Sequence, residues 1–337
     1  MGSRKRILII HTGGTFGMVP MPLSLVLVPD QVAAHILTHV PELEKLARID
    51  FQCAFNLDSA DIQIPHWQQL ARIVADHLDA YDGFVIIHGT DSMVYTAAAL
   101  SFMLRQLPKP VILTGSQRPL AEIRSDARMN LINSVELATY PIPEVAIFFG
   151  TRLYRGNRTV KYSSIHYNAF ESPNFPPLAE VGIDIRVYDR HLQRKGEFEL
   201  REAFCDQVLA IRFFPGLRPD YLQFLTDLPV KAVVLEALGL GNVAVKAQSL
   251  VPLVRALREA GKWVVVTSQS RHGGVDLSRY ENGVMLQQAG ALGAGDMTTE
   301  ATIVKLMHLL GQKDYDVQQI PEMLHKSLAG EISSKEK

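Results

Sequence analysis

The strongest constraint on the fold is the regular alternation of short apolar runs with longer segments of helical periodicity. Unbroken runs of Val, Ile, Leu and Phe predict strands that are buried on both faces, as in parallel sheets whose crossover connections are helices. The predicted strands are 6–11, 84–88, 111–114, 145–149, 207–213, 232–236 and 263–268.

The segments between these runs have helical spacing. Trp67, Leu70, Val74 and Leu78 recur every three or four residues, which predicts an amphipathic helix with one buried face. The predicted helices are 30–46, 65–80, 92–104, 125–139, 219–225, 246–260 and 298–309. The fold class is therefore α/β with mostly parallel sheets.

A length of 337 residues is enough for about two domains. The composition changes at "DRHLQRKGEFELRE", residues 189–202, which is charged and lacks a buried-strand pattern. We therefore predict an N-terminal α/β catalytic domain at 1–188, a linker at 189–203 and a C-terminal α/β domain at 204–337.

Charge and composition exclude several classes of function. Lys and Arg total 34 against 35 Asp and Glu, a net charge of −1, and there is no basic run that would favour nucleic acid or anionic lipid as a partner. The apolar stretch at 7–10 is too short for a signal peptide, and no window is long enough to span a membrane. Cys53 and Cys205 lack metal-ligand or C-x-x-C spacing, so we expect reduced thiols in the cytoplasm.

Polar and glycine residues follow several predicted strands, and ligands of open parallel sheets bind beyond the carboxyl ends of strands. The segments are "HTGGTFG" at 11–17, "LDSADI" at 57–62, "HGTDSM" at 88–93 and "TGSQ" at 114–117. Each has an ordinary structural interpretation as well. Thr90 or Asp91 could cap the next helix, Asp58 and Ser59 could form a turn, and His11 and His88 are interpreted as hydrogen-bonded core histidines. The glycine turn lacks G-x-G-x-x-G and a P-loop lysine, which disfavours nucleotide binding.

Taken together, these segments match one family in order and spacing. Further segments of the match are "PVILTGSQRPLAEIRSDARMNLINS" at 110–134, "RLYRGNRTVK" at 152–161, "GLGN" at 239–242 and "GAGDMTTEATIVKLMHLL" at 293–310. The chain resembles the bacterial-type L-asparaginases, most closely the cytoplasmic type I branch, over nearly its whole length. The resemblance implies a larger N-terminal and a smaller C-terminal α/β domain.

The resemblance also implies hydrolysis of an amide to a carboxylate and ammonia through an acyl-enzyme. It assigns Thr15 as the nucleophile, with Thr90, Asp91 and Lys161 as the accompanying hydroxyl, carboxylate and amine. This assignment is chemically reasonable, because a threonine hydroxyl is a weak nucleophile until a neighbouring base takes its proton. A developing oxyanion would need donors such as the backbone amides of a glycine-rich turn.

Substrate binding is assigned in the same way, to Asp58, Ser59 and Asp91, which would hold the amino-acid end of L-asparagine. Carboxylates beside a substrate ammonium form charge-assisted hydrogen bonds. No His, Asp or Glu set has zinc spacing, so no metal is predicted, and no cofactor is implied. The resemblance further implies a homodimer or homotetramer.

One segment departs from the family. The lid that follows the first threonine motif usually carries a tyrosine, whereas 16–30 here contains three prolines and only one hydroxyl, on Ser24. Tyr162, beside Lys161, is the nearest substitute in the sequence. The alternatives to an L-asparaginase are therefore an amidohydrolase for another amide, a subunit of an archaeal-type glutamyl-tRNA amidotransferase, and a non-catalytic amino-acid-binding protein.

Overall fold

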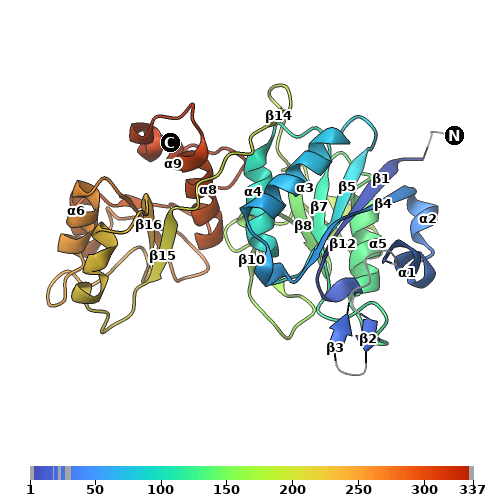
Figure 1. Cartoon of the computed structure of the whole chain (residues 1–337), viewed down its shortest axis with the longest axis horizontal. Helices are drawn as coiled ribbons and strands as arrows, with labels where there is room; N and C mark the ends of the chain where they lie inside the picture. The colour runs from blue at the N-terminus through green and yellow to red at the C-terminus, as the bar shows by residue number, and fades with distance from the viewer. Residues whose placement is uncertain (1–3, 18, 22–23, 27–31, 334–337) are drawn as a thin grey trace. The chain divides into compact units, whose positions relative to one another are not determined.

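A computed structural model describes residues 4–17, 19–21, 24–26 and 32–333 of the chain (Figure 1). It divides into two compact units, Met1–Glu202 and Ala203–Lys337. The charged segment predicted as a linker lies mostly in the first unit, where β14 (Glu199–Leu200) pairs with β6 (Leu104–Arg105). The boundaries at 188–189 and 203–204 stay predictions.

The first unit is built on an eight-stranded sheet with the order β13-β12-β9-β8-β7-β5-β1-β4. All strands from β4 to β8 in this order are parallel neighbours, as the apolar runs predict. Their bounds are Arg48–Leu57 for β4, Arg6–Gly13 for β1, Gly83–Ile87 for β5, Val111–Thr114 for β7 and Val145–Phe149 for β8.

The sequence analysis missed both ends of this sheet. β4 lies at one edge, where it pairs only with β1, and its alternating polar and apolar residues are half-exposed rather than continuously buried. At the other end, antiparallel pairing adds β9 (Arg152–Arg155), β12 (Ala179–Val181) and β13 (Ile185–Val187). These strands are short, so they give no long apolar run to detect.

Helices connect the parallel strands. They are α1 (Val32–His39), α2 (Leu43–Leu46), α3 (Ile64–Asp76), α4 (Met93–Met103) and α5 (Ala127–Leu137). The single helix predicted at 30–46 is wrong. Pro41 has no backbone N–H and disfavours helical geometry at the residue before it, so the helix stops and restarts as α2. Asp30, the predicted start, lies outside the described residues.

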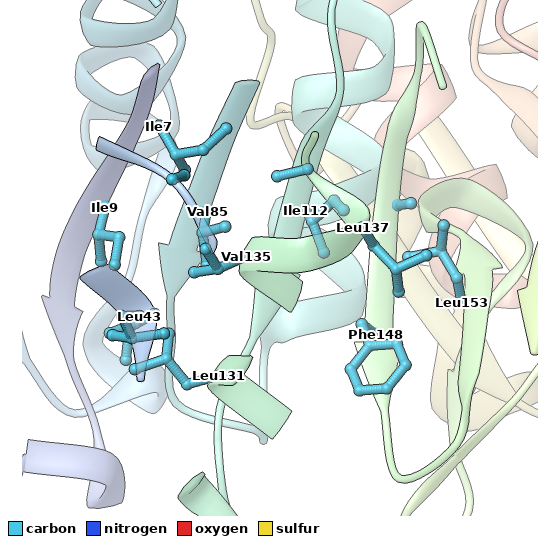
Figure 2. Packing of buried hydrophobic residues seen from close by; sticks show 14 of the residues in the cluster. Ile7, Ile9, Leu43, Val85, Ile112, Leu131, Val135, Leu137, Phe148 and Leu153 are labelled. Carbon is cyan, nitrogen blue, oxygen red and sulfur yellow. The ribbon is translucent and has the colours of Figure 1, made fainter. Parts of the chain in front are cut away.

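Both faces of the sheet are buried. Ile7 and Ile9 of β1 belong to the core cluster that includes Leu131 and Val135 of α5 (Figure 2). The intervening Leu8 and Ile10 of β1 are equally buried. A strand with apolar side chains on both faces cannot lie at the solvent surface, which accounts for the central place of β1.

The second unit has a four-stranded parallel sheet with the order β15-β16-β17-β18. The strands are β15 (Val208–Arg212), β16 (Ala232–Ala237), β17 (Trp263–Ser268) and β18 (Leu292–Gly293). Its α-helices are α6 (Val251–Glu259), α7 (Glu281–Gln288), α8 (Thr299–Gly311) and α9 (Ile320–His325). The helix predicted at 219–225 is a 3-10 helix, η5 (Pro219–Thr226), and α7, α9 and β18 were not predicted.

A fully buried ion pair fixes the last residues of this unit. Lys305 Nζ of α8 lies 2.5 Å from Glu331 Oε1, and neither side chain is exposed. Lys305 also donates to the backbone carbonyls of Leu324 and Lys326, and Glu331 accepts from the N–H of Ala329. Every charge in this buried set therefore has a partner, which is the condition under which ions remain buried in a protein.

Candidate active site

The predicted site residues lie at one edge of the first unit's sheet. β4, β1, β5 and β7 are parallel, so their carboxyl ends meet at the same edge. Each strand is followed by one of the polar segments found in the sequence. These segments contain Asp58 and Ser59 after β4, Thr15 after β1, Thr90 and Asp91 after β5, and Gln117 after β7.

Glycine allows the first of these loops to touch one another through their backbones. Gly14 has a φ of +81°, and a Cβ atom there would lie 2.6 Å from the Cα of Gly89. A Cβ on Gly89 would in turn lie 2.7 Å from the Cβ of Ser59. Thr15 and Thr90 therefore each follow one of two glycines that are in direct contact.

Lys161 reaches this edge from a separate short strand, β10 (Val160–Lys161), which pairs with β11 (Phe170–Glu171). Its Nζ donates to Thr90 Oγ1 at 2.8 Å and to Asp91 Oδ1 at 2.5 Å. The Lys161 side chain is 16% exposed, whereas that of Asp91 is 71% exposed. The predicted hydroxyl, carboxylate and amine are thus brought together, with the carboxylate facing solvent.

Gln117 makes the remaining contact of the Thr90 hydroxyl and was not singled out in the sequence. Thr90 Oγ1 lies 3.3 Å from Gln117 Oε1, and Gln117 Nε2 donates to the carbonyl of His166 at 3.2 Å. A carbonyl can only accept, so the amide group of Gln117 must face His166 and its oxygen must face Thr90. Thr90 therefore accepts a hydrogen bond from Lys161 and donates one to Gln117.

The loop that carries Gln117 is held by two side chains of the segment at the start of α5. The carboxylate of Asp126 accepts from the backbone N–H of Gln117 at 3.0 Å and of Arg118 at 3.2 Å, and Asn130 Nδ2 donates to the carbonyl of Gly115 at 2.9 Å. Burial raises the pKa of Asp126, although these backbone hydrogen bonds oppose the shift. Sequence reasoning missed both residues, and their spacing of four on a helix was the only available signal.

Ser59 links the loop after β4 to the residues after β5. Its buried Oγ accepts from the backbone N–H of Asp91 at 3.2 Å, and its carbonyl accepts from Ser92 Oγ at 2.5 Å. Asp58 caps the 3-10 helix η3 (Ser59–Asp61) by accepting from Ala60 N at 2.8 Å, as the turn interpretation predicts.

The capping interpretation of Thr90 and Asp91 is wrong. The N-cap residue of α4 is Ser92, and no side-chain hydrogen bond caps this helix. Both Thr90 and Asp91 instead contact Lys161. A lysine from a distant segment was the partner that local sequence patterns could not reveal.

Thr15 begins the short 3-10 helix η1 (Thr15–Gly17) and is partly exposed. The next residue, Phe16, is buried, and its carbonyl accepts from Leu120 N at 3.2 Å, which connects η1 to the loop after β7. Within the described residues, the Thr15 hydroxyl makes no hydrogen bond. It is therefore available to a substrate.

The segment predicted as a lid is described only in part. β2 (Val19–Met21) and β3 (Ser24–Val26) pair as an antiparallel hairpin, and the side chain of Ser24 lies outside what the structure describes. Tyr162 directly follows Lys161 in extended chain, so the two side chains point to opposite sides. Tyr162 instead interacts electrostatically with the buried Tyr154, which favours a packing role.

The two histidines that end buried strands are core histidines, as predicted. His11 Nδ1 accepts from Gly13 N at 3.1 Å, and His88 contacts Thr96 and the carbonyl of Gly89. Burial lowers the pKa of each to about 4. Both are therefore neutral at pH 7. In the described ranges, no group of three or more His, Cys, Asp or Glu residues is placed to hold a metal ion.

Comparisons with known proteins cover nearly the whole chain. The family model described as "Asparaginase, N-terminal" matches residues 6–193, and "Glutaminase/Asparaginase C-terminal domain" matches residues 207–324. L-asparaginase 1 of Escherichia coli is 41% identical over 98% of both chains. The structure of a thermostable L-asparaginase from Thermococcus kodakarensis is 37% identical, with a TM-score of 0.89 over 98% of this chain and 100% of that one. A probable cytoplasmic L-asparaginase from Campylobacter jejuni is 26% identical, with a TM-score of 0.80 over 96% of this chain and 100% of that one.

The contact between Gly14 and Gly89 predicts a large effect of one methyl group. Gly14→Ala should lower the free energy of unfolding by about 3 kcal/mol or more, because left-handed strain of roughly 1–2 kcal/mol is added to a clash between two backbones. Gly216→Ala is the matched control, since Gly216 has a φ of +100° but nothing within 4 Å of an added Cβ. Urea denaturation measures both, and equal losses would contradict the proposed backbone contact.

Burial of His88 predicts loss of stability in acid. The unfolded residue binds its proton near its ordinary pKa of 6.5 and the folded one near 4, so stability is fully present above pH 6.5 and is lost as the pH falls through about 4. The total is about 3 kcal/mol at 1.36 kcal/mol per pH unit. Unfolding free energies measured between pH 7 and 4 should fall less steeply in His88→Gln. An unchanged slope would show that His88 does not titrate in this way.

Proposed function

The chain belongs to the L-asparaginase family, and from this membership we propose that it is an L-asparagine amidohydrolase that acts through an acyl-enzyme on Thr15. One observation carries the proposal. Lys161 Nζ lies between Thr90 Oγ1 and Asp91 Oδ1, at the sheet edge that also carries Thr15. Hydroxyl, amine and carboxylate groups at one edge are what two successive acyl transfers require.

In the first step, the Thr15 hydroxyl attacks the side-chain amide carbon of asparagine and loses its proton to a neighbouring base. The tetrahedral intermediate then expels its nitrogen as ammonia, after that nitrogen gains a proton, and leaves an aspartyl ester on Thr15. In the second step, water attacks the ester and releases L-aspartate. Each step moves one proton toward and one away from the reacting centre, so a group that exchanges protons must lie beside it.

Thr90 and Lys161 supply that exchange in the proposal. The Thr90 oxygen accepts a hydrogen bond from Lys161, and the exposed Asp91 carboxylate balances the lysine's charge. The backbone N–H groups of Gly14 and Asp91 already donate to Leu57 and Ser59. The oxyanion must therefore be stabilised by other donors at this edge.

We propose that Asp58, Ser59 and Asp91 bind the amino-acid end of the substrate. The Asp91 carboxylate faces solvent beside Lys161 and can accept hydrogen bonds from a substrate ammonium. Ser59 fixes the backbone of Asp91 through its hydroxyl, so the two loops would recognise the substrate as one unit. No cofactor or metal is part of the proposed reaction.

Localisation and assembly belong to the proposal as well. The Campylobacter jejuni relative carries the word cytoplasmic in its title, and we propose the same compartment for this chain. In the described part of the chain, no helix is both long and apolar enough to cross a membrane. We further propose a homodimer or homotetramer, as the family resemblance implies.

Ammonia release from L-asparagine, D-asparagine and L-glutamine tests the proposed function. We expect L-asparagine to be hydrolysed with the highest kcat/KM. Efficient hydrolysis of another amide would make the chain an amidohydrolase of different specificity. No ammonia from any of the three amides would favour the non-catalytic alternative, which the enzyme names of the relatives do not support.

Thr15→Val tests the nucleophile, because valine has nearly the same shape and no hydroxyl. We expect turnover to fall by several orders of magnitude with an unchanged unfolding free energy. Thr151→Val, a change of an exposed threonine outside the site, should leave turnover unaltered. Acid-quenched wild type should carry an aspartyl group on Thr15 by mass spectrometry. Activity within tenfold of wild type, about 1.4 kcal/mol of barrier, would overturn the assignment.

A further inference from the structure

Three buried polar side chains connect the interior of the first unit to the peptide that precedes Thr90. Trp67 Nε1 of α3 donates to Thr96 Oγ1 of α4 at 3.0 Å. Thr96 Oγ1 lies 2.9 Å from His88 Nε2, and His88 Nδ1 lies 2.7 Å from the carbonyl oxygen of Gly89. All three side chains are less than 10% exposed. We call them the Trp67 network.

The direction of each hydrogen bond in the Trp67 network follows from the chemistry of its groups. An indole N–H can only donate, so the Thr96 oxygen accepts from Trp67. A backbone carbonyl can only accept, so His88 Nδ1 carries the ring proton and donates to Gly89. In the neutral ring, Nε2 is then an acceptor, and the single hydroxyl proton of Thr96 goes to it. The network therefore has one consistent arrangement of protons, which ends at Gly89.

Gly89 lies in the most crowded part of the candidate active site. Its backbone is in contact with Gly14 on one side and with Ser59 on another. The carbonyl of His88 is similarly close to Gly115, where a Cβ would lie 2.3 Å away. The backbone has no room to shift, and His88 fixes the one freedom that remains, the rotation of the peptide between Gly89 and Thr90.

We infer that Trp67, Thr96 and His88 are positioning residues that set the orientation of the Gly89–Thr90 peptide, and thereby hold the Thr90 hydroxyl within reach of Lys161. The inference rests on the proposed role of Thr90 in amide hydrolysis. None of the three side chains contacts the substrate in this account. They act through the backbone, and a rotated peptide would carry the Thr90 oxygen away from its 2.8 Å contact with Lys161.

A purely structural role would not require this arrangement. Three apolar side chains could fill the same volume, without buried donors and acceptors that each need a partner. The binding loops, by contrast, have their own supports, because Ser59 Oγ holds the Asp91 backbone independently of the Trp67 network. Loss of the network should therefore affect kcat much more than KM, since small misplacements of a reacting group are costly.

Thr96→Val is the decisive variant, because it keeps the shape and removes the central hydroxyl. We expect kcat for L-asparagine to fall about tenfold or more, with KM within twofold of wild type. Thr96→Ser restores the hydroxyl and should recover most of kcat. Thr302→Val is the matched control, since Thr302 is also fully buried in a helix and donates to a backbone carbonyl at 2.8 Å. It should lower the urea midpoint about as much as Thr96→Val and leave kcat unchanged.

Crystal structures of wild type and Thr96→Val provide a test that does not depend on activity. We expect the Gly89–Thr90 peptide to rotate in the variant, and the contact between Lys161 Nζ and Thr90 Oγ1 to lengthen beyond hydrogen-bond distance. An unmoved peptide, or an unchanged kcat in an active enzyme, would overturn the inference. If wild type hydrolyses no amide, the proposed function fails, and the peptide orientation alone decides whether the Trp67 network positions Thr90.

Discussion

The close approach of the backbones of Gly14 and Gly89 is the constraint on which the candidate active site depends. Parallel strands bring four loops to one edge, but side chains would normally separate those loops by several ångströms. Glycine removes that separation, at the entropic cost that this residue carries when it becomes ordered. The hydroxyls of Thr15 and Thr90 are consequently presented to the same space by two different strands.

Within this space, Thr90 is constrained from both ends. Its hydroxyl is oriented by Lys161 and Gln117, and its backbone by the carbonyl of Gly89, which His88 fixes from the interior. A threonine oxygen has one proton to give and two lone pairs to offer, so these contacts leave a single lone pair for a substrate or water. The site is therefore ordered before a substrate arrives, which is the condition for efficient electrostatic catalysis.

The fold was predictable where burial is continuous and not where it alternates. Strands β7, β8 and β17 have the bounds that their apolar runs predict, because only strands covered on both faces have such runs. β4 was missed because an edge strand exposes part of every turn of its pattern, and Pro41 divides a helix that periodicity alone would continue. In the site, the strand-end motifs and Lys161 were identified through a family resemblance. Gln117 and Asp126 were not, because their partners lie in loops and strands that only the tertiary structure brings near.

The buried pair of Lys305 and Glu331 has a practical consequence for handling the protein. Glu331 lies close to the end of the chain, yet it is fully buried and neutralises a lysine in the interior of the second unit. Removal of the final residues up to and including Glu331 would leave an ammonium group without its carboxylate, and breaking such a pair commonly costs about 3–5 kcal/mol. Affinity tags and fusion partners should therefore be joined beyond Ser333, and expression fragments trimmed at the carboxyl end should retain it.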